Sequence, residues 1–135
     1  MAASFLEEKK TTLYCLKGKG GKEALKKELE EEGIQAEDGF LCEGALRISG
    51  YDSLWRIPAF RQGKCFVQDE SSMLAGKVAD PKEGQKILDI CSAPGGKALY
   101  AADKLHGTGQ VLARDLTDYK EELLKENIER VGFET

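Results

Sequence analysis

Apolar residues recur along this chain with two different spacings, and the pattern changes near residue 69. In the first half, runs rich in β-branched and aromatic residues predict short strands at 11–16, 34–36, 45–48 and 64–68. One helix is predicted after the first strand, from Lys22 to Glu32, because Leu25 and Leu29 lie one turn apart on one face. The first half is therefore expected to hold strands around a single amphipathic helix.

Glycine and proline mark the ends of these elements. The run Gly18-Lys19-Gly20-Gly21 ends the first strand. Gly33 is predicted to end the helix in the left-handed conformation, so that Ile34 can pack back on Leu29. Pro58 closes an aromatic-rich connection at 51–60. The order of strand, helix and further strands predicts a small α+β unit of ferredoxin-like or RNA-recognition-motif-like topology.

Residues 69–105 follow a different pattern. Asp69 is a candidate N-cap for a helix that runs to Ala79, with Leu74 and Val78 on one face. Residues 86–90 form a short, nearly continuous apolar run, which is typical of a strand buried on both faces of a parallel sheet. A loop at 91–96 then leads into a helix predicted at 97–105.

A second strand and helix complete the pattern. Residues 111–113 predict another buried strand, which ends at Asp115. Thr117 is a candidate N-cap for a final helix, and Gly132 is predicted to end it with Phe133 folded back on its last turn. The buried face of that helix is expected to hold Leu124, Ile128 and Val131.

Residues 86–131 thus predict one β-α-β-α run, the first half of a doubly wound α/β nucleotide-binding fold. We place a small α+β domain at residues 1–68 and the start of a Rossmann-like α/β domain at residues 69–135. Such sheets hold roughly five to seven strands. The sheet is therefore expected to be incomplete, and its apolar strands need other cover.

The charge balance narrows the classes of partner. The chain has 135 residues and a formal net charge of −4, whereas a general polyanion binder is usually strongly basic. A patch at Lys17, Lys19 and Lys22 is compatible with local RNA binding and equally with a solvated loop. No apolar run is long enough to cross a membrane, and residues 1–5 do not begin a signal peptide. We therefore expect a cytoplasmic protein that does not contact membranes.

The cysteine pattern argues against a metal site. None of the four cysteines, Cys15, Cys42, Cys65 and Cys91, forms a CxxC pair, so no zinc site is expected. In the cytoplasm these thiols would stay reduced. The single histidine, His106, precedes a glycine at a predicted helix end, which favours a structural residue over a catalytic partner for a thiol.

The strongest chemical signal is the loop that follows residues 86–90. Its glycines, Gly95 and Gly96, let a ligand approach the backbone, and the next helix directs its free N–H groups at that ligand. Asp115, at the end of the next strand, can accept hydrogen bonds from both ribose hydroxyls. Taken alone, the two glycines could form a plain tight turn, and Asp115 could be a helix N-cap. A P-loop is excluded because Ala98 stands where that motif needs Ser or Thr.

The sequence from Asp89 to Lys97, Asp-Ile-Cys-Ser-Ala-Pro-Gly-Gly-Lys, resembles the cofactor motif of the Sun-type bacterial 16S ribosomal RNA cytosine-5 methyltransferases and their nucleolar relatives. The upstream segments 45–63 and 66–72 are similar to those that precede the motif in the family. The resemblance covers most of residues 11–133. It implies an RNA cytosine-5 methyltransferase that uses S-adenosylmethionine, with RNA, in particular ribosomal RNA, as its partner.

The resemblance also implies roles for individual residues. Asp115 would hold the ribose, Gln68 and Asp69 would shape the methionine end, and the small domain would help to present RNA. The loop residues that would line the cofactor site are Cys91, Ser92, Ala93, Pro94, Gly95, Gly96 and Lys97. In the family a cysteine attacks C6 of cytosine and a second one helps to release the product. Those cysteines belong to later motifs, beyond the end of this chain, so the chain alone is predicted to be inactive and Cys91 receives no catalytic role.

Three positions depart from the family pattern. Residues 11–15 lack the Arg-x-Asn of its first strand, Ala98 replaces a more usual threonine, and Arg114 precedes Asp115 where smaller residues are common. Two other classes therefore stay open. One is a non-catalytic RNA-binding module in which the glycine loop only links elements, and the other is a different adenosylmethionine-dependent methyltransferase.

Overall fold

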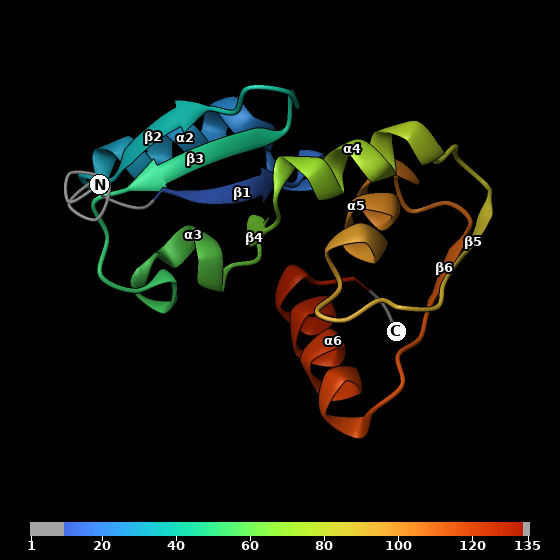
Figure 1. The fold of residues 1–135 in the computed structure, drawn as a ribbon. Coiled ribbons are helices and arrows are strands. Elements are labelled where there is room, and N and C mark those ends of the chain that lie inside the picture. Colours follow the sequence, from blue (N-terminus) through green and yellow to red (C-terminus); the bar gives the residue numbers. More distant parts are fainter. Residues whose placement is uncertain (1–9, 134–135) are drawn as a thin grey trace, which may run out of the picture.

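Two separate β-sheets organise the computed structural model, which describes residues 10–133 (Figure 1). Residues 1–5, where the sequence predicts no signal peptide, lie outside the described residues. The strands of the first sheet are β1 Thr11–Cys15, β2 Gln35–Asp38, β3 Ala45–Ser49 and β4 Cys65–Val67. Their order is β2-β3-β1-β4, and every neighbouring pair is antiparallel.

Short helices complete this first unit. Their bounds are η1 Lys17–Lys19, α2 Gly21–Glu31, η2 Leu54–Arg56 and α3 Pro58–Arg61. The chain order β1-α2-β2-β3-α3-β4 with β1 and β3 in the centre is the ferredoxin-like topology, as the sequence predicts. Pro58 begins α3 instead of closing an irregular connection, because proline fits the first helical position, where its missing N–H is not needed.

The second sheet contains two parallel strands. The elements of this part are α4 Glu70–Ala79, β5 Lys86–Asp89, α5 Gly96–Lys104, β6 Gln110–Ala113 and α6 Asp118–Val131. Strands β5 and β6 pair in register, with Ile87 opposite Val111, and α5 forms the crossover between them. This is the predicted β-α-β-α run.

Local signals place the helix ends well. Gly33 and Gly132 both adopt positive φ, and the next residues donate back to the helices, Ile34 N to Leu29 O at 3.0 Å and Phe133 N to Ile128 O at 3.2 Å. The Thr117 hydroxyl accepts from Lys120 N at 3.3 Å, as predicted for an N-cap. Asp69 is the N-cap residue of α4, but its side chain makes no capping hydrogen bond.

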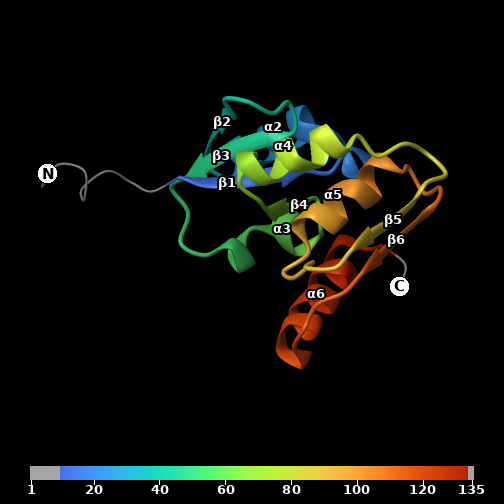
Figure 2. The ribbon, with the colours of Figure 1, turned by 45° about the vertical axis from the view of Figure 1, so that its right-hand side comes forward.

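The first sheet lies between two apolar layers. On one face, Leu13 and Cys15 pack with Leu25 and Leu29 of α2. On the other face, the buried group consists of Tyr14, Leu16, Ala45, Phe66, Met73, Leu99, Tyr100 and Val131. Helices α4 and α5 therefore lie between the two sheets, as Figure 2 shows.

A buried carboxylate joins the first sheet to α5. Asp103, 5% exposed, accepts a hydrogen bond from the Tyr14 hydroxyl at 2.6 Å. It also accepts the backbone N–H groups of Lys17 at 3.0 Å and Gly18 at 3.2 Å. Burial, and then the hydrogen bond to Asp103, raise the pKa of Tyr14 far above its ordinary value, so the hydroxyl stays a donor. The Tyr14 ring also lies 5.0 Å from that of Tyr100, between centroids.

Helix α6 reaches the first unit through Arg130. Its Nη1 donates to Phe60 O at 2.7 Å and to Cys65 O at 2.9 Å. The guanidinium lies 3.9 Å from the centroid of the Phe60 ring. Gly63 allows this approach, because a Cβ there would lie 2.0 Å from Arg130 O.

A third contact holds the start of α4. The Glu70 carboxylate accepts the backbone N–H groups of Phe40, Leu41 and Cys42 at 3.1, 2.7 and 3.0 Å. Burial opposes ionisation, yet these three hydrogen bonds hold the pKa of Glu70 below its usual value. The segment between β4 and α4 is thereby tied to the β2–β3 loop.

Two expectations about burial are wrong. Leu88 and Leu112 are 60% and 50% exposed, because β5 and β6 pair only with each other in the described part of the chain and α5 leaves one face uncovered. Val78 is 85% exposed. The buried face of α4 consists instead of Met73 and Gly76, since only a residue without Cβ fits against the Tyr100 ring. Within residues 10–133, the structure contains no helix with the length and hydropathy of a membrane span.

Hydrogen exchange should separate the two sheets. We expect amides of β5 and β6 to exchange at least about tenfold faster than those of β1 and β3, because a two-stranded sheet with one bare face opens more easily. Exchange of the intact chain, followed residue by residue, measures this. Uniform protection across residues 11–131 would contradict it.

The contact between Gly63 and α6 can be tested against a second glycine. We expect Gly63→Ala to destabilise the chain by about 3 kcal/mol or more, because positive φ and a steric clash with Arg130 O both add. Gly84 has a similar φ of +82° but nothing within 4 Å of its Cβ position, so Gly84→Ala should cost only about 1–2 kcal/mol. Urea unfolding of both variants gives the difference. Equal losses would show that α6 does not pack on this turn.

Candidate cofactor-binding site

The loop at 91–95 lies at the carboxyl ends of β5 and β6. Two hydrogen bonds extend the strand pairing beyond β5, from Arg114 N to Asp89 O at 2.8 Å and from Ser92 N to Arg114 O at 3.0 Å. The loop therefore starts from a fixed position. Carboxyl edges of this kind are where open α/β sheets bind their ligands.

Backbone geometry explains the two glycines of the loop. Gly95 has a φ of +116°, and a Cβ there would lie 2.9 Å from Leu124 Cδ1. A Cβ on Gly96 would lie 3.3 Å from Gln68 Nε2. The peptide bond between Ala93 and Pro94 is cis, and Pro94 O accepts from Asn127 Nδ2 at 2.8 Å. The loop is thus held by α6 on one side and approached by Gln68 on the other.

Asp115 fastens the loop to the next strand. Its carboxylate accepts Ala93 N at 2.9 Å and Leu116 N at 2.7 Å, and Lys120 Nζ lies 3.7 Å away. The side chain is 2% exposed. The hydrogen bonds from Leu116 and Ala93 hold the pKa of Asp115 below its usual value. Since Thr117 caps α6, Asp115 is a loop clamp and not the N-cap.

Several buried polar atoms around this loop have no hydrogen-bond partner among the described residues. They are Gln68 Oε1 and Nε2, Asp89 Oδ2 and Ser92 Oγ. Gln68 and Ser92 are only 5% and 4% exposed. An unsatisfied buried polar atom costs about 1–3 kcal/mol, and such atoms are rare unless they serve a ligand or water. Next to the N-terminal N–H groups of α5, they fit a polar ligand with both donors and acceptors.

The structure brings most of the predicted site residues together. Residues 92–96 form one turn clamped by Asp115, with Gln68 against Gly96. Cys91 and Lys97 flank this turn and are exposed, and Asp69, the N-cap residue of α4, is exposed as well. Sequence reasoning missed Asp89, whose Oδ1 accepts Cys91 N at 3.2 Å. The available signal was an acid at the end of a short apolar strand.

The thiols are not arranged for nucleophilic attack. Burial raises the pKa of Cys15 far above its ordinary value and that of Cys65 to about 12. Burial also raises the pKa of Cys42. His106 lies exposed at the end of α5, with a φ of +50°. Across residues 10–133, His, Cys, Asp and Glu side chains do not gather in any group of three that could hold a metal ion.

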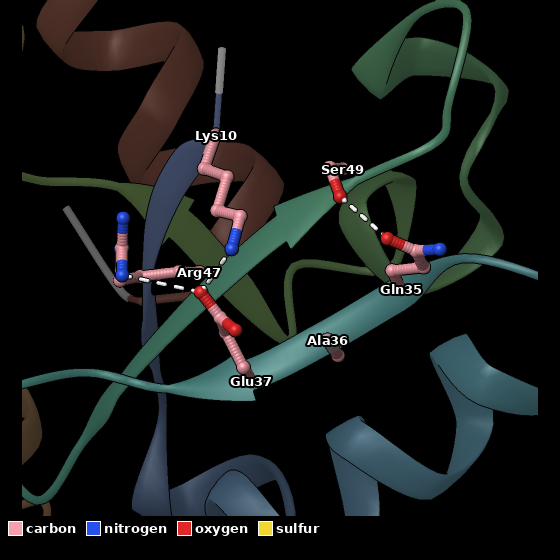
Figure 3. A pocket seen from close by; sticks show the side chains of 6 residues that line it. All are labelled: Lys10, Gln35, Ala36, Glu37, Arg47 and Ser49. Atoms are coloured by element: carbon pink, nitrogen blue, oxygen red, sulfur yellow. Dashed lines mark hydrogen bonds and ion pairs between the residues drawn. The ribbon is translucent and has the colours of Figure 1, made fainter. Parts of the chain in front are cut away.

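A hollow on the first sheet offers a contrast (Figure 3). It is lined by Lys10, Gln35, Ala36, Glu37, Arg47 and Ser49. Glu37 pairs with Lys10 and, at 3.1 Å, with Arg47, and the hydrogen bond from Lys10 lowers its pKa. Ser49 Oγ donates to Gln35 Oε1 at 3.3 Å. The polar side chains named here all have partners, unlike those around the loop after β5, which remains the candidate site.

A parallel β-α-β unit, a glycine turn at its carboxyl edge and an acid after the next strand define the start of a Rossmann-like α/β fold. Residues 77–135 match the family described as 16S rRNA methyltransferase RsmB/F. A probable ribosomal RNA small subunit methyltransferase B of Bacillus subtilis is 36% identical over 92% of this chain. A tRNA (cytosine(72)-C(5))-methyltransferase of Pyrococcus horikoshii is 33% identical over 76% of it. These matches confirm the resemblance seen in the sequence, because residues 77–135 match the family model and most of the chain is similar to RNA methyltransferases.

A solved structure shows the same fold. NSun6 from Pyrococcus horikoshii, solved with SFG, superimposes with a TM-score of 0.84 over 95% of this chain and 56% of its own, at 18% identity. The mixed α/β fold predicted from the sequence is therefore confirmed. The chain spans 28% of the length of the Bacillus relative and 26% of the Pyrococcus one.

The Asp115 clamp predicts a pH dependence. The folded-state pKa of Asp115 is lowered, so its contribution to stability is present above the unfolded-state pKa of about 3.9 and is lost as the pH falls through the folded-state value. We therefore expect Asp115→Asn to destabilise the chain at pH 7 and to have a smaller effect near pH 2. Urea midpoints at both pH values measure this, with Asp118→Asn, an exposed acid nearby, as the control. An Asp115→Asn effect that is independent of pH would contradict the clamp.

Proposed function

We propose that this chain supplies the cofactor loop of an S-adenosylmethionine-dependent RNA cytosine-5 methyltransferase. The observation that carries the proposal is the set of unpartnered buried polar atoms around residues 92–96, beside the N-terminus of α5. The family relationship supports the same reaction class. The first residues of α5 present N–H groups that can hold the methionine carboxylate, and Asp115 can accept the ribose hydroxyls.

The remaining polar atoms suit the methionine end of the cofactor. Gln68 Oε1 and Asp89 Oδ2 can accept hydrogen bonds from an ammonium group, and Ser92 Oγ can donate or accept. Gln68 belongs to the segment between β4 and α4, so the first domain would contribute to the site. SFG, an analogue of S-adenosylmethionine, bound to the Pyrococcus NSun6 supports this cofactor class. We place the boundary between the two domains at residues 68 and 69.

Bound S-adenosylmethionine supplies an electrophilic methyl group, and its acceptor would be C5 of a cytosine in RNA, ribosomal RNA in the first instance. The chain would orient the cofactor without attacking the base itself. Cys15, Cys42 and Cys65 have raised pKa values, which disfavour the thiolate that attack needs. Cys91 lies in the cofactor loop. The chain is accordingly expected to bind cofactor without catalysing methyl transfer.

Titration with S-adenosylmethionine tests the cofactor site directly. We expect saturable amide shifts confined to residues 92–97, Asp115 and the Gln68 side chain in the isotopically labelled chain. We expect Ser92→Ala to weaken binding about tenfold, the value of one hydrogen bond of about 1.4 kcal/mol. The same variant should unfold at an equal or higher urea concentration, because it removes a buried polar atom without a partner.

Ser71→Ala is the matched control, since Ser71 is exposed in the first turn of α4. It should leave both binding and stability unchanged. A chain that keeps its dispersed amide spectrum but shows no shifts on titration would sink the proposal. A Ser92→Ala variant that loses stability without losing affinity would show that this hydroxyl serves the fold and not the ligand.

A further inference from the structure

Three lysines converge at the end of α5 that lies away from the cofactor loop. Lys104 is the last residue of α5, whereas Gly96 beside the loop is its first. Lys17 and Lys19 belong to η1, which follows β1 in the other domain. The three side chains therefore come from two segments, η1 and α5, that are far apart in sequence.

The Asp103 carboxylate fixes this arrangement. It accepts Lys17 N at 3.0 Å and Gly18 N at 3.2 Å, which holds η1 against the last turn of α5. Lys104, the next residue, has its Nζ 5.2 Å from the centroid of the Tyr100 ring. Lys19 Nζ lies 3.3 Å from the position that a Cβ on Gly132 would occupy. The lysines thus line the seam between η1, α5 and the end of α6.

Their charges are only partly compensated within the described part of the chain. Burial, and next the neighbouring ammonium of Lys17, lower the pKa of Lys104. The carboxylates of Asp103 and Glu43 act in the opposite direction, and Asp103 carries one full negative charge, which its hydrogen bonds hold beside η1 and the end of α5. Lys22, Lys26 and Lys64 each pair with a carboxylate within 4 Å. Among residues 10–133, Lys17, Lys19 and Lys104 have no such ion pair.

The sequence grouped Lys22 with Lys17 and Lys19, and the structure changes this grouping. Lys22 Nζ lies 3.6 Å from Asp38 Oδ2, so a carboxylate already faces its charge. Lys104 takes its place, although no sequence pattern links residues 17 and 104. The glycines around Lys19 leave the cluster open, with Lys17 and Lys19 exposed.

We propose that Lys17, Lys19 and Lys104 form a contact for the phosphate backbone of substrate RNA, one helix length from the cofactor loop. Two neighbouring ammonium groups with no carboxylate paired to them within 4 Å among residues 10–133 favour a ligand with closely spaced anionic oxygens, as in adjacent phosphates. The inference rests on the proposed function, which makes RNA the polyanion that this chain meets. An RNA held here would extend across the seam between the two domains.

Fluorescence anisotropy of the full 135-residue chain with a labelled single-stranded RNA of about twelve nucleotides tests the contact. Each phosphate contact contributes about 0.7 to the salt slope of log affinity for a single strand. We expect Lys17→Gln/Lys104→Gln to reduce the slope by about 1.4 and to weaken binding about fivefold to tenfold at low salt. Lys17→Arg/Lys104→Arg should keep both, because it keeps the charges.

The control is Lys82→Gln/Lys125→Gln, which removes two exposed lysines that pair with Asp80 and Glu121. It should leave the slope within about 0.3 of the unchanged chain. An equal loss in the control, an unchanged Lys17→Gln/Lys104→Gln variant, or no saturable RNA binding by the unchanged chain would each overturn the proposal. Displacement of the RNA by an equally charged glutamate peptide would assign the cluster to an acidic protein instead.

The cofactor titration on the same variants separates this inference from the proposed function. Unaltered shifts at residues 92–97 together with weaker RNA binding would support the lysine contact and the cofactor site independently. A chain without cofactor shifts would remove the proposed function, and the salt slopes would still decide whether the lysines contact phosphate.

Discussion

The hydrogen bonds to the Asp103 carboxylate are the contact on which the relative position of the two domains depends. Their donors, the Tyr14 hydroxyl and the amides of Lys17 and Gly18, all belong to the first domain, whereas Asp103 belongs to the helix that begins at the cofactor loop. A carboxylate buried to this degree is tolerated only when its oxygens are satisfied. The arrangement therefore has little freedom to shift without exposing or orphaning a charge.

The candidate site divides its polar groups into two sets. Backbone N–H groups and the Asp115 carboxylate bind each other and fix the loop, while the side chains of Gln68, Asp89 and Ser92 keep atoms unpaired. Glu70, through the β2–β3 loop, holds the segment that carries Gln68. The ferredoxin-like domain thus acts on the site by positioning one side chain, in addition to any contact with RNA.

Local sequence patterns predicted the helices and strands. They failed to predict burial where it depends on residues distant in the sequence. Gly33, Thr117 and Gly132 define helix ends because their conformations or hydrogen bonds involve only residues nearby. The face of α4 depends on the Tyr100 ring, and the exposure of Leu88 depends on neighbours that its strand lacks, so neither could be read from periodicity. The sequence did hold a signal for Asp103, because an acid stands one turn after Leu99 on an apolar helix face. It held none for its partner Tyr14. Whether the loop residues and Asp115 bind cofactor remains a prediction.

The contacts between the domains also set an order of assembly. Tyr14 and Asp103 are 89 residues apart, and Arg130 and Phe60 are 70 apart, whereas the strands of the first sheet pair across shorter separations. Long loops close slowly because their entropy must be lost before any contact forms. We therefore expect the first sheet to form early and to serve as the surface on which α5 and α6 condense. A newly made chain would acquire its cofactor loop late, after the tyrosine that anchors the far end of α5 is already in place.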